Sequence, residues 1–200
     1  MQVRQIDVAG NVGEASSLGS VTVDVSAAAP TLALESDTGT SASDHVTSDG
    51  TVLVSGLEDG ASYEYSTDGG TTWVAGTGTS FTLGEGTYAD VQVRQSDAAG
   101  NVSAAASLGA VTVDTSAAAP VVALASDTGT SNSDGITSDG TVTVSGLEDG
   151  ATYEYSTDGG TTWIAGTGTS FELAAGTYTD VEVRQTDVAG NVSEAASLAA

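Results

Sequence analysis

Short runs of alternating hydrophobic and polar residues recur along the whole chain, with Gly, Asp and Asn between them. In residues 51–55, Val52 and Val54 point to one face and Leu53 to the other. Residues 141–145 keep both valines but have threonine in place of the leucine, so we predict that the valine face lies in a core. No segment keeps a helical period, and about seven runs per repeating unit predict an all-β, antiparallel, immunoglobulin-like sandwich.

The pattern has a fixed period. The motif Val-Arg-Gln-x-Asp-x-Ala-Gly-Asn-Val occurs three times, with its aspartate at Asp7, Asp97 and Asp187, and both 97 − 7 and 187 − 97 equal 90. Pro30 and Pro120 are also 90 residues apart, since 120 − 30 equals 90, and each ends a Ser-Ala-Ala-Ala-Pro linker. A unit of this size can bury its own core, so we expect one domain per repeat. A β-solenoid would require a much shorter period.

The period divides the chain into residues 1–24, residues 25–114 (repeat 1) and residues 115–200 (repeat 2). We expect repeats 1 and 2 to be sandwiches stacked end to end. Residues 1–24 match only the end of a repeat and should form an incomplete hairpin, with a strand through Val3 and a second strand closing at Asp24. Such a hairpin is marginally stable alone, so it should be frayed, docked on repeat 1 or paired with another molecule. We interpret the chain as an excised fragment that begins within a domain.

Four aromatic residues have predicted roles. Tyr88 and Tyr178 each follow a glycine at the start of the penultimate strand, where a tyrosine corner would fix the chain. Trp73 and Trp163 each come just after an Asp-Gly hairpin turn, a position that favours packing in the core. The alternative is that these tryptophans are exposed and stack on a sugar ring.

The charge is strongly one-sided. The chain has 27 acidic residues and three basic ones, Arg4, Arg94 and Arg184, which gives a formal net charge of −24. Three arginines cannot form a basic face, so nucleic acid is excluded as a partner. The chain has no cysteine, and therefore neither disulfides nor thiol chemistry. No apolar run is long enough to span a bilayer, and the N-terminus lacks a signal-peptide pattern.

The only histidine, His45, is the starting point for any enzymatic interpretation. Ser43 and Asp44 precede it, but three consecutive residues of an extended loop point in different directions and cannot form a catalytic relay. Repeat 2 has Gly135 at the equivalent position. We therefore interpret His45 as a solvated loop residue and expect no enzymatic activity.

Acidic residues at the junctions are candidate calcium ligands, because Ca²⁺ prefers six to eight oxygen ligands from carboxylates and carbonyls. In a sandwich, the loops after the second and sixth strands lie at the same end as the incoming linker. Each junction should therefore gather one set of ligands, either Asp24, Glu58, Asp59, Asp97 and Asn101, or Asp114, Glu148, Asp149, Asp187 and Asn191.

The long acidic loop after the first strand of each repeat lies at the opposite end. In repeat 1 it should face the top of repeat 2, and its aspartates could add ligands or form a separate site. The alternative is that they only cap turns. The candidates are Asp37, Asp44 and Asp49 in repeat 1 and Asp127, Asp134 and Asp139 in repeat 2.

Several motifs together resemble a known family. Ser-Asp-Thr-Gly, Asp-Gly-Thr-Val-x-Val-Ser-Gly-Leu, Tyr-Ser-Thr-Asp-Gly-Gly-Thr-Thr-Trp and Asp-x-Ala-Gly-Asn-Val are similar to the bacterial immunoglobulin-like repeats of large, type I secreted surface and biofilm adhesins of the RTX type. The resemblance covers the whole chain. It implies a stalk outside the cell, in which calcium stiffens the junctions between neighbouring identical repeats. We therefore expect a structural extender, with a carbohydrate-binding module that uses an exposed tryptophan as the alternative.

Overall fold

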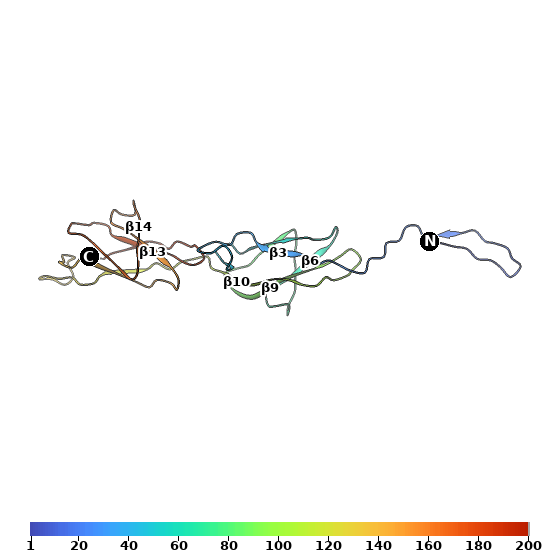
Figure 1. The fold of residues 1–200 in the computed structure, drawn as a ribbon, viewed down its shortest axis with the longest axis horizontal. Helices are drawn as coiled ribbons and strands as arrows, with labels where there is room; N and C mark the ends of the chain where they lie inside the picture. Colours follow the sequence, from blue (N-terminus) through green and yellow to red (C-terminus); the bar gives the residue numbers. More distant parts are fainter. Residues whose placement is uncertain (200) are drawn as a thin grey trace.

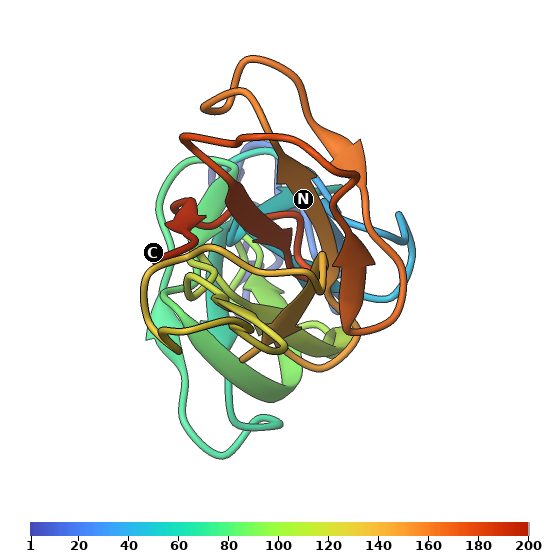
Figure 2. The same ribbon diagram turned by 90° about the vertical axis from the view of Figure 1, so that its left-hand side faces the viewer.

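The computed structural model describes residues 1–199, and Figure 1 shows them as two strand-rich bodies and a separate N-terminal hairpin along one axis. Viewed from the end, the two bodies overlap, so the repeats are stacked end to end (Figure 2). All regular elements within residues 1–199 are strands. This confirms the all-β prediction. That part of the chain contains no helix that could cross a membrane.

Repeat 1 is a sandwich of a three-stranded sheet, β3-β5-β8, and a five-stranded sheet, β4-β10-β9-β6-β7. The pairs are antiparallel except for β4 and β10, which are parallel. The strands are β3 (Thr31–Leu34), β4 (Val46–Thr47), β5 (Thr51–Ser55), β6 (Ser62–Ser66), β7 (Val74–Ala75), β8 (Ser80–Thr82), β9 (Gly86–Ser96) and β10 (Ala106–Val113).

Repeat 2 has the sheets β11-β12-β15 and β14-β13-β16-β17. Its strands are β11 (Val121–Leu124), β12 (Thr141–Ser145), β13 (Thr152–Ser156), β14 (Ile164–Ala165), β15 (Ser170–Glu172), β16 (Glu182–Thr186) and β17 (Ala196–Ser197). β16 and β17 are shorter than β9 and β10. In repeat 1, Val111 to Val113 of β10 pair with the start of β9.

Each repeat has its own hydrophobic core between its two sheets. In repeat 1 the predicted face, Val52 and Val54, is buried against Val91 and Val93, while Leu53 is exposed. Burying a valine side chain stabilises the fold by roughly 1.5–3 kcal/mol relative to leaving it in water, so this alternation fixes which face of each strand turns inward.

The predicted tyrosine corners are confirmed. The hydroxyl of Tyr88 donates a hydrogen bond to the Gly84 carbonyl at 2.9 Å, and that of Tyr178 donates to Ala174 at 3.1 Å. The bond of Tyr88 ties the start of β9 to the chain four residues upstream, and that of Tyr178 does the same for the segment that precedes β16.

The prediction that the tryptophans lie in the core is wrong. Trp73 is half-buried outside the core of repeat 1, just before the edge strand β7. The Arg94 guanidinium stacks on its ring at 4.1 Å and forms an ion pair with Glu64 at 2.8 Å. Trp163 is also half-buried, with Arg184 stacked on it at 4.1 Å. The cation–π contact and the ion pair hold the indole on the outer face of the sheet.

The N-terminal hairpin pairs β1 (Gln2–Val3) only with β2 (Ser16–Ser17), and it extends away from repeat 1 (Figure 1). The predicted second strand through Asp24 is therefore wrong beyond residue 17. Val21 and Val23 are 60% and 80% exposed. The equivalent residues of β10, Val111 and Val113, are buried and pair with Tyr88 and Gly86 of β9, whereas residues 18–24 belong to no strand.

His45 lies in a loop, as predicted, but it is half-buried and not fully solvated. It has a φ of 58°, and its N–H donates to Asp37 Oδ2 at 3.1 Å. Its carbonyl accepts the N–H of Thr112 at 2.9 Å, next to the β4–β10 pair. Gly135, its counterpart, has a φ of 70°. The position requires a left-handed backbone, which glycine adopts without strain and histidine tolerates.

Candidate functional site

The candidate site begins with a turn that the chain builds three times. In the turn of repeat 1, Asp97 Oδ1 accepts the N–H groups of Ala99 and Asn101, and Asp97 Oδ2 accepts Asn101 Nδ2 at 2.7 Å. These bonds, above all the one from the Asn101 side chain, lower the pKa of Asp97. Asp7 makes the same bonds with Ala9 and Asn11 in the isolated hairpin. The aspartate therefore organises the turn even where no other carboxylate is near.

A buried glutamine joins this end of the repeat to the linker. Gln95 Nε2 donates to the carbonyls of Ala28 in the linker at 2.7 Å and of Gly56 at 3.2 Å, and Gln95 Oε1 accepts the N–H of Glu58 at 2.8 Å. Gln185 makes the equivalent three bonds in repeat 2. One fully buried amide thus fixes the linker and the acidic turn after β5 at once.

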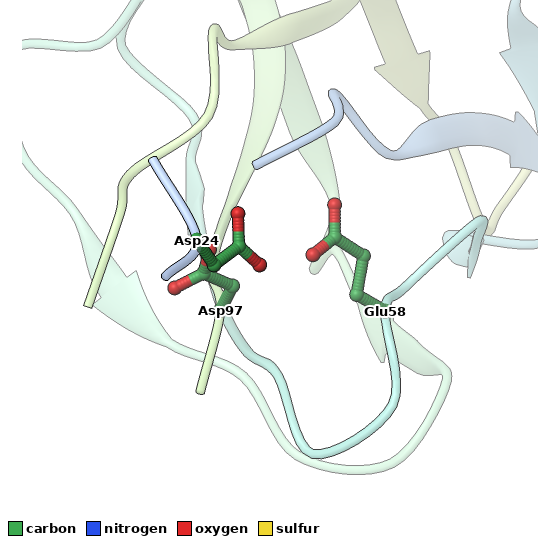
Figure 3. A group of neighbouring side chains, drawn as sticks. All are labelled: Asp24, Glu58 and Asp97. Atoms are coloured by element: carbon green, nitrogen blue, oxygen red, sulfur yellow. The ribbon is translucent and has the colours of Figure 1, made fainter. Parts of the chain in front are cut away.

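These bonds bring three carboxylates together at the start of repeat 1. Glu58 Oε1 accepts the N–H of Ala28 at 2.7 Å, and Asn101 Nδ2 donates to the Asp24 carbonyl at 3.2 Å. As a result Asp24, Glu58 and Asp97 each offer an oxygen within 4.8 Å of the other two. Figure 3 shows Asp24 beside Asp97, with Glu58 across from them.

The second cluster lies between the repeats. Asp114, Glu148 and Asp187 also offer oxygens within 4.8 Å of one another, and Asp187 is only 3% exposed. Asp114 belongs to the end of repeat 1, because its N–H donates to the Thr47 carbonyl at 3.0 Å. Its own carbonyl accepts Asn191 Nδ2 at 2.8 Å. The cluster therefore joins one carboxylate held by repeat 1 to two held by repeat 2.

The electrostatics of this cluster favour a cation. Two unit charges about 5 Å apart repel by roughly 3 kcal/mol at an effective dielectric near 20, and by less where water screens them. Within residues 1–199, Glu148 Oε2 and Asp114 Oδ2 accept no hydrogen bond, while Oε1 of Glu148 accepts the N–H of Ala118. Carboxylate oxygens are hard ligands of the kind that Ca²⁺ takes, and those of Asp114, Glu148 and Asp187 come within 4.8 Å of one another.

The remaining predicted junction residues do not belong to the two carboxylate clusters. Asp59 and Asp149 are exposed and do not belong to either cluster of three. Asn101 and Asn191 direct their amide nitrogens at linker carbonyls, so they position the cluster through hydrogen bonds.

The structure does not gather the long-loop aspartates into a group of three anywhere in residues 1–199. Most of their hydrogen bonds cap local turns, and the Thr141 hydroxyl and N–H lower the pKa of Asp139. One oxygen each of Asp37 and Asp127 is buried without a hydrogen-bond donor from the described residues. The backbone N–H groups that these carboxylates accept belong to His45 for Asp37, Val46 for Asp44, Thr51 for Asp49, Gly135 for Asp127, Ile136 for Asp134 and Thr141 for Asp139.

Sequence reasoning missed the two glutamines. The signal was present, because Val91, Val93 and Gln95 alternate along β9 and must point to the same face. A polar residue at an inward position should have been expected to satisfy buried backbone groups.

Comparison with known proteins gives one family match. Residues 25–115 match the model of the bacterial Ig-like domain family. No curated protein matches the chain. A structure of the fibronectin(III)-like modules of Clostridium thermocellum CbhA is similar, with 16% identity over 84% of this chain and 91% of that chain and a TM-score of 0.44.

Proposed function

We propose that the chain is a structural extender in the stalk of a bacterial cell-surface adhesin, because residues 25–115 match the model of the bacterial Ig-like domain family. The observation that carries the proposal is the end-to-end arrangement in Figure 1, in which the hairpin, repeat 1 and repeat 2 follow one another along one axis, so each repeat adds length. Domains of this family are often found in extracellular and surface proteins, which supports an extracellular location.

We further propose that Ca²⁺ binds both carboxylate clusters. At the inter-repeat cluster it would be held by Asp114, Glu148 and Asp187, with water and carbonyl oxygens completing the six to eight ligands that Ca²⁺ takes. Because these carboxylates come from both repeats, the ion would restrict bending between them. At a free calcium concentration ten times the dissociation constant, one site stabilises the bound form by about 1.4 kcal/mol. Extracellular modules typically bind in the range of about 0.1–1 mM.

Isothermal titration calorimetry with calcium tests this proposal. We expect two sites in the parent chain and one in each of the variants Glu58→Gln and Glu148→Gln. Glutamine keeps one side-chain oxygen to accept the linker N–H groups of Ala28 and Ala118, and it removes the charge and the second oxygen that a cation would use. The two variants control for each other because the residues are equivalent. Equal binding by the parent and the double variant would contradict calcium at these clusters.

A carbohydrate-binding module is the second candidate, favoured by the surface position of Trp73 and Trp163. One face of each indole is covered by an arginine, which leaves less of the ring for a sugar. Tryptophan fluorescence separates the two functions. Emission that no glycan alters supports the extender, and quenching by a glycan supports the binding module.

We propose no catalytic role. His45 Nδ1 lies 3.3 Å from the Ala110 carbonyl, and Asp44 caps the N–H of Val46. Both residues are used in shaping the loop, so they do not orient each other as a base and its partner would.

A further inference from the structure

The two repeats also touch away from the linker and the carboxylates. The tip of the long loop of repeat 1 (residues 38–40, the loop tip) lies against the turn of repeat 2 (residues 187–191). The Thr38 hydroxyl donates to the Ala189 carbonyl at 2.6 Å. The backbone N–H of Thr40, the last residue of the loop tip, donates to the Val188 carbonyl at 3.2 Å. These bonds tie the body of repeat 1 directly to repeat 2.

The contact buries part of a turn whose equivalents in the hairpin and in repeat 1 are exposed to solvent. Ala189 is only 1% exposed, whereas its equivalents Ala9 and Ala99 are exposed. In all three turns the asparagine donates its backbone N–H and its side-chain amide to the aspartate. Since the turns are alike, the burial of Ala189 comes from what lies over it, and the loop tip occupies that place.

The fit depends on glycine. Gly39 has a φ of 91°, and a Cβ there would overlap the Val188 carbonyl oxygen and lie 2.8 Å from the Ala189 carbonyl carbon. On the other side, a Cβ at Gly190 would lie 3.0 Å from the Cα of Gly39. Two backbones approach this closely only where neither carries a side chain.

Repeat 2 contains the same loop tip without a partner among the described residues. Thr128 Oγ1 accepts the N–H of Ser138 at 2.7 Å, as Thr38 Oγ1 accepts that of Ser48 at 2.7 Å. Each threonine also lies within hydrogen-bond distance of a second threonine hydroxyl in its loop. The loop tip is therefore shaped before it docks, which lowers the entropic cost of docking.

We propose that the loop tip and the turn of repeat 2 form a metal-independent latch. The loop tip recognises one kind of partner, the Asp-x-Ala-Gly-Asn turn of the following repeat. The latch and the bound cation would each restrict the angle between the repeats. This inference rests on the proposed extender function. Within residues 1–199 no loop tip contacts the hairpin joint at residues 24–30, so there the cation would act without a latch, in addition to the hydrogen bonds of Glu58, Gln95 and Asn101.

Spin-label distances between the repeats test the latch. The chain has no cysteine, so the exposed residues Ala33 and Ala123 can be replaced by cysteine and labelled specifically. The test variant is Gly39→Ala, and the matched control is Gly129→Ala. Both glycines have positive φ, 91° and 115°, so the backbone strain is similar, but only Gly39 faces another repeat.

In chelator we expect the distance distribution of Gly39→Ala to be roughly twofold wider than that of the parent, because an unlatched joint samples more orientations. Gly129→Ala should match the parent. A second pair protects against misfolding of the loop, since Ala189→Leu should widen the distribution and Ala99→Leu should not. Equal distributions for Gly39→Ala and Gly129→Ala in chelator would overturn the latch. If calcium leaves the parent distribution unchanged while Gly39→Ala widens it, calcium stiffening fails and the latch stands.

Discussion

At the scale of single residues, the buried glutamines connect the fold to the candidate site. Gln185 holds the linker through the carbonyl of Ala118 and holds the Glu148 backbone through its side-chain oxygen. Burial of an amide is tolerated only when its hydrogen bonds are made. The same three bonds that satisfy it also place Glu148 in the carboxylate cluster.

We expect Gln185→Leu to lower the free energy of unfolding of repeat 2 by roughly 2–4 kcal/mol, because it removes the three hydrogen bonds of a fully buried amide. Gln95→Leu should do the same to repeat 1. Gln5, the third equivalent, is exposed in the hairpin, so Gln5→Leu should be neutral. Urea unfolding followed by near-UV circular dichroism measures all three. Similar losses for Gln5→Leu and Gln185→Leu would show that burial of the amide is not the cause.

At the scale of elements, alternation predicted the core strands, because burial fixes which face of a strand turns inward. The strand at 51–55 and the tyrosine corners could be derived in this way. The place of Trp73 could not, because it depends on Arg94 and Glu64 from two other strands. The three-carboxylate clusters followed from placing loops at one end of a sandwich. The glutamine clamp and the latch require contacts that no local pattern specifies.

The hairpin turns that follow β6 and β13 contain aspartates that should make the stability of the fold depend on pH. The Thr72 side chain, its N–H and the Ser66 hydroxyl lower the pKa of Asp68 to about 2, and the Thr162 N–H and hydroxyl lower that of Asp158 to about 2. A carboxyl whose pKa is lower in the folded state stabilises the fold above its unfolded pKa near 3.8, and this contribution is lost as the pH falls toward 2.

We therefore expect the unfolding midpoint of the parent to fall more between pH 5 and 2 than that of the double variant Asp68→Asn, Asp158→Asn. Asparagine keeps one acceptor oxygen but does not titrate. Differential scanning calorimetry across this range gives the comparison. Parallel curves for the two proteins would mean that these aspartates do not set the acid response.

At the scale of the whole molecule, the central claim is that stacked repeats form a rod whose joints are held by cations. Two joints are present, one at Asp24, Glu58 and Asp97 and one between the repeats, and the latch supports only the second. Loss of the cation should therefore loosen the hairpin joint most and the inter-repeat joint in part. Each loosened joint bends the rod and shortens its largest dimension.

Small-angle X-ray scattering in millimolar calcium and then in chelator tests this claim most directly. We expect the maximum dimension of the parent to decrease in chelator. The double variant Glu58→Gln, Glu148→Gln should have the smaller dimension under both conditions, because two of the carboxylates that would hold the ions are neutral. A maximum dimension of the parent that is the same in calcium and in chelator would contradict the account.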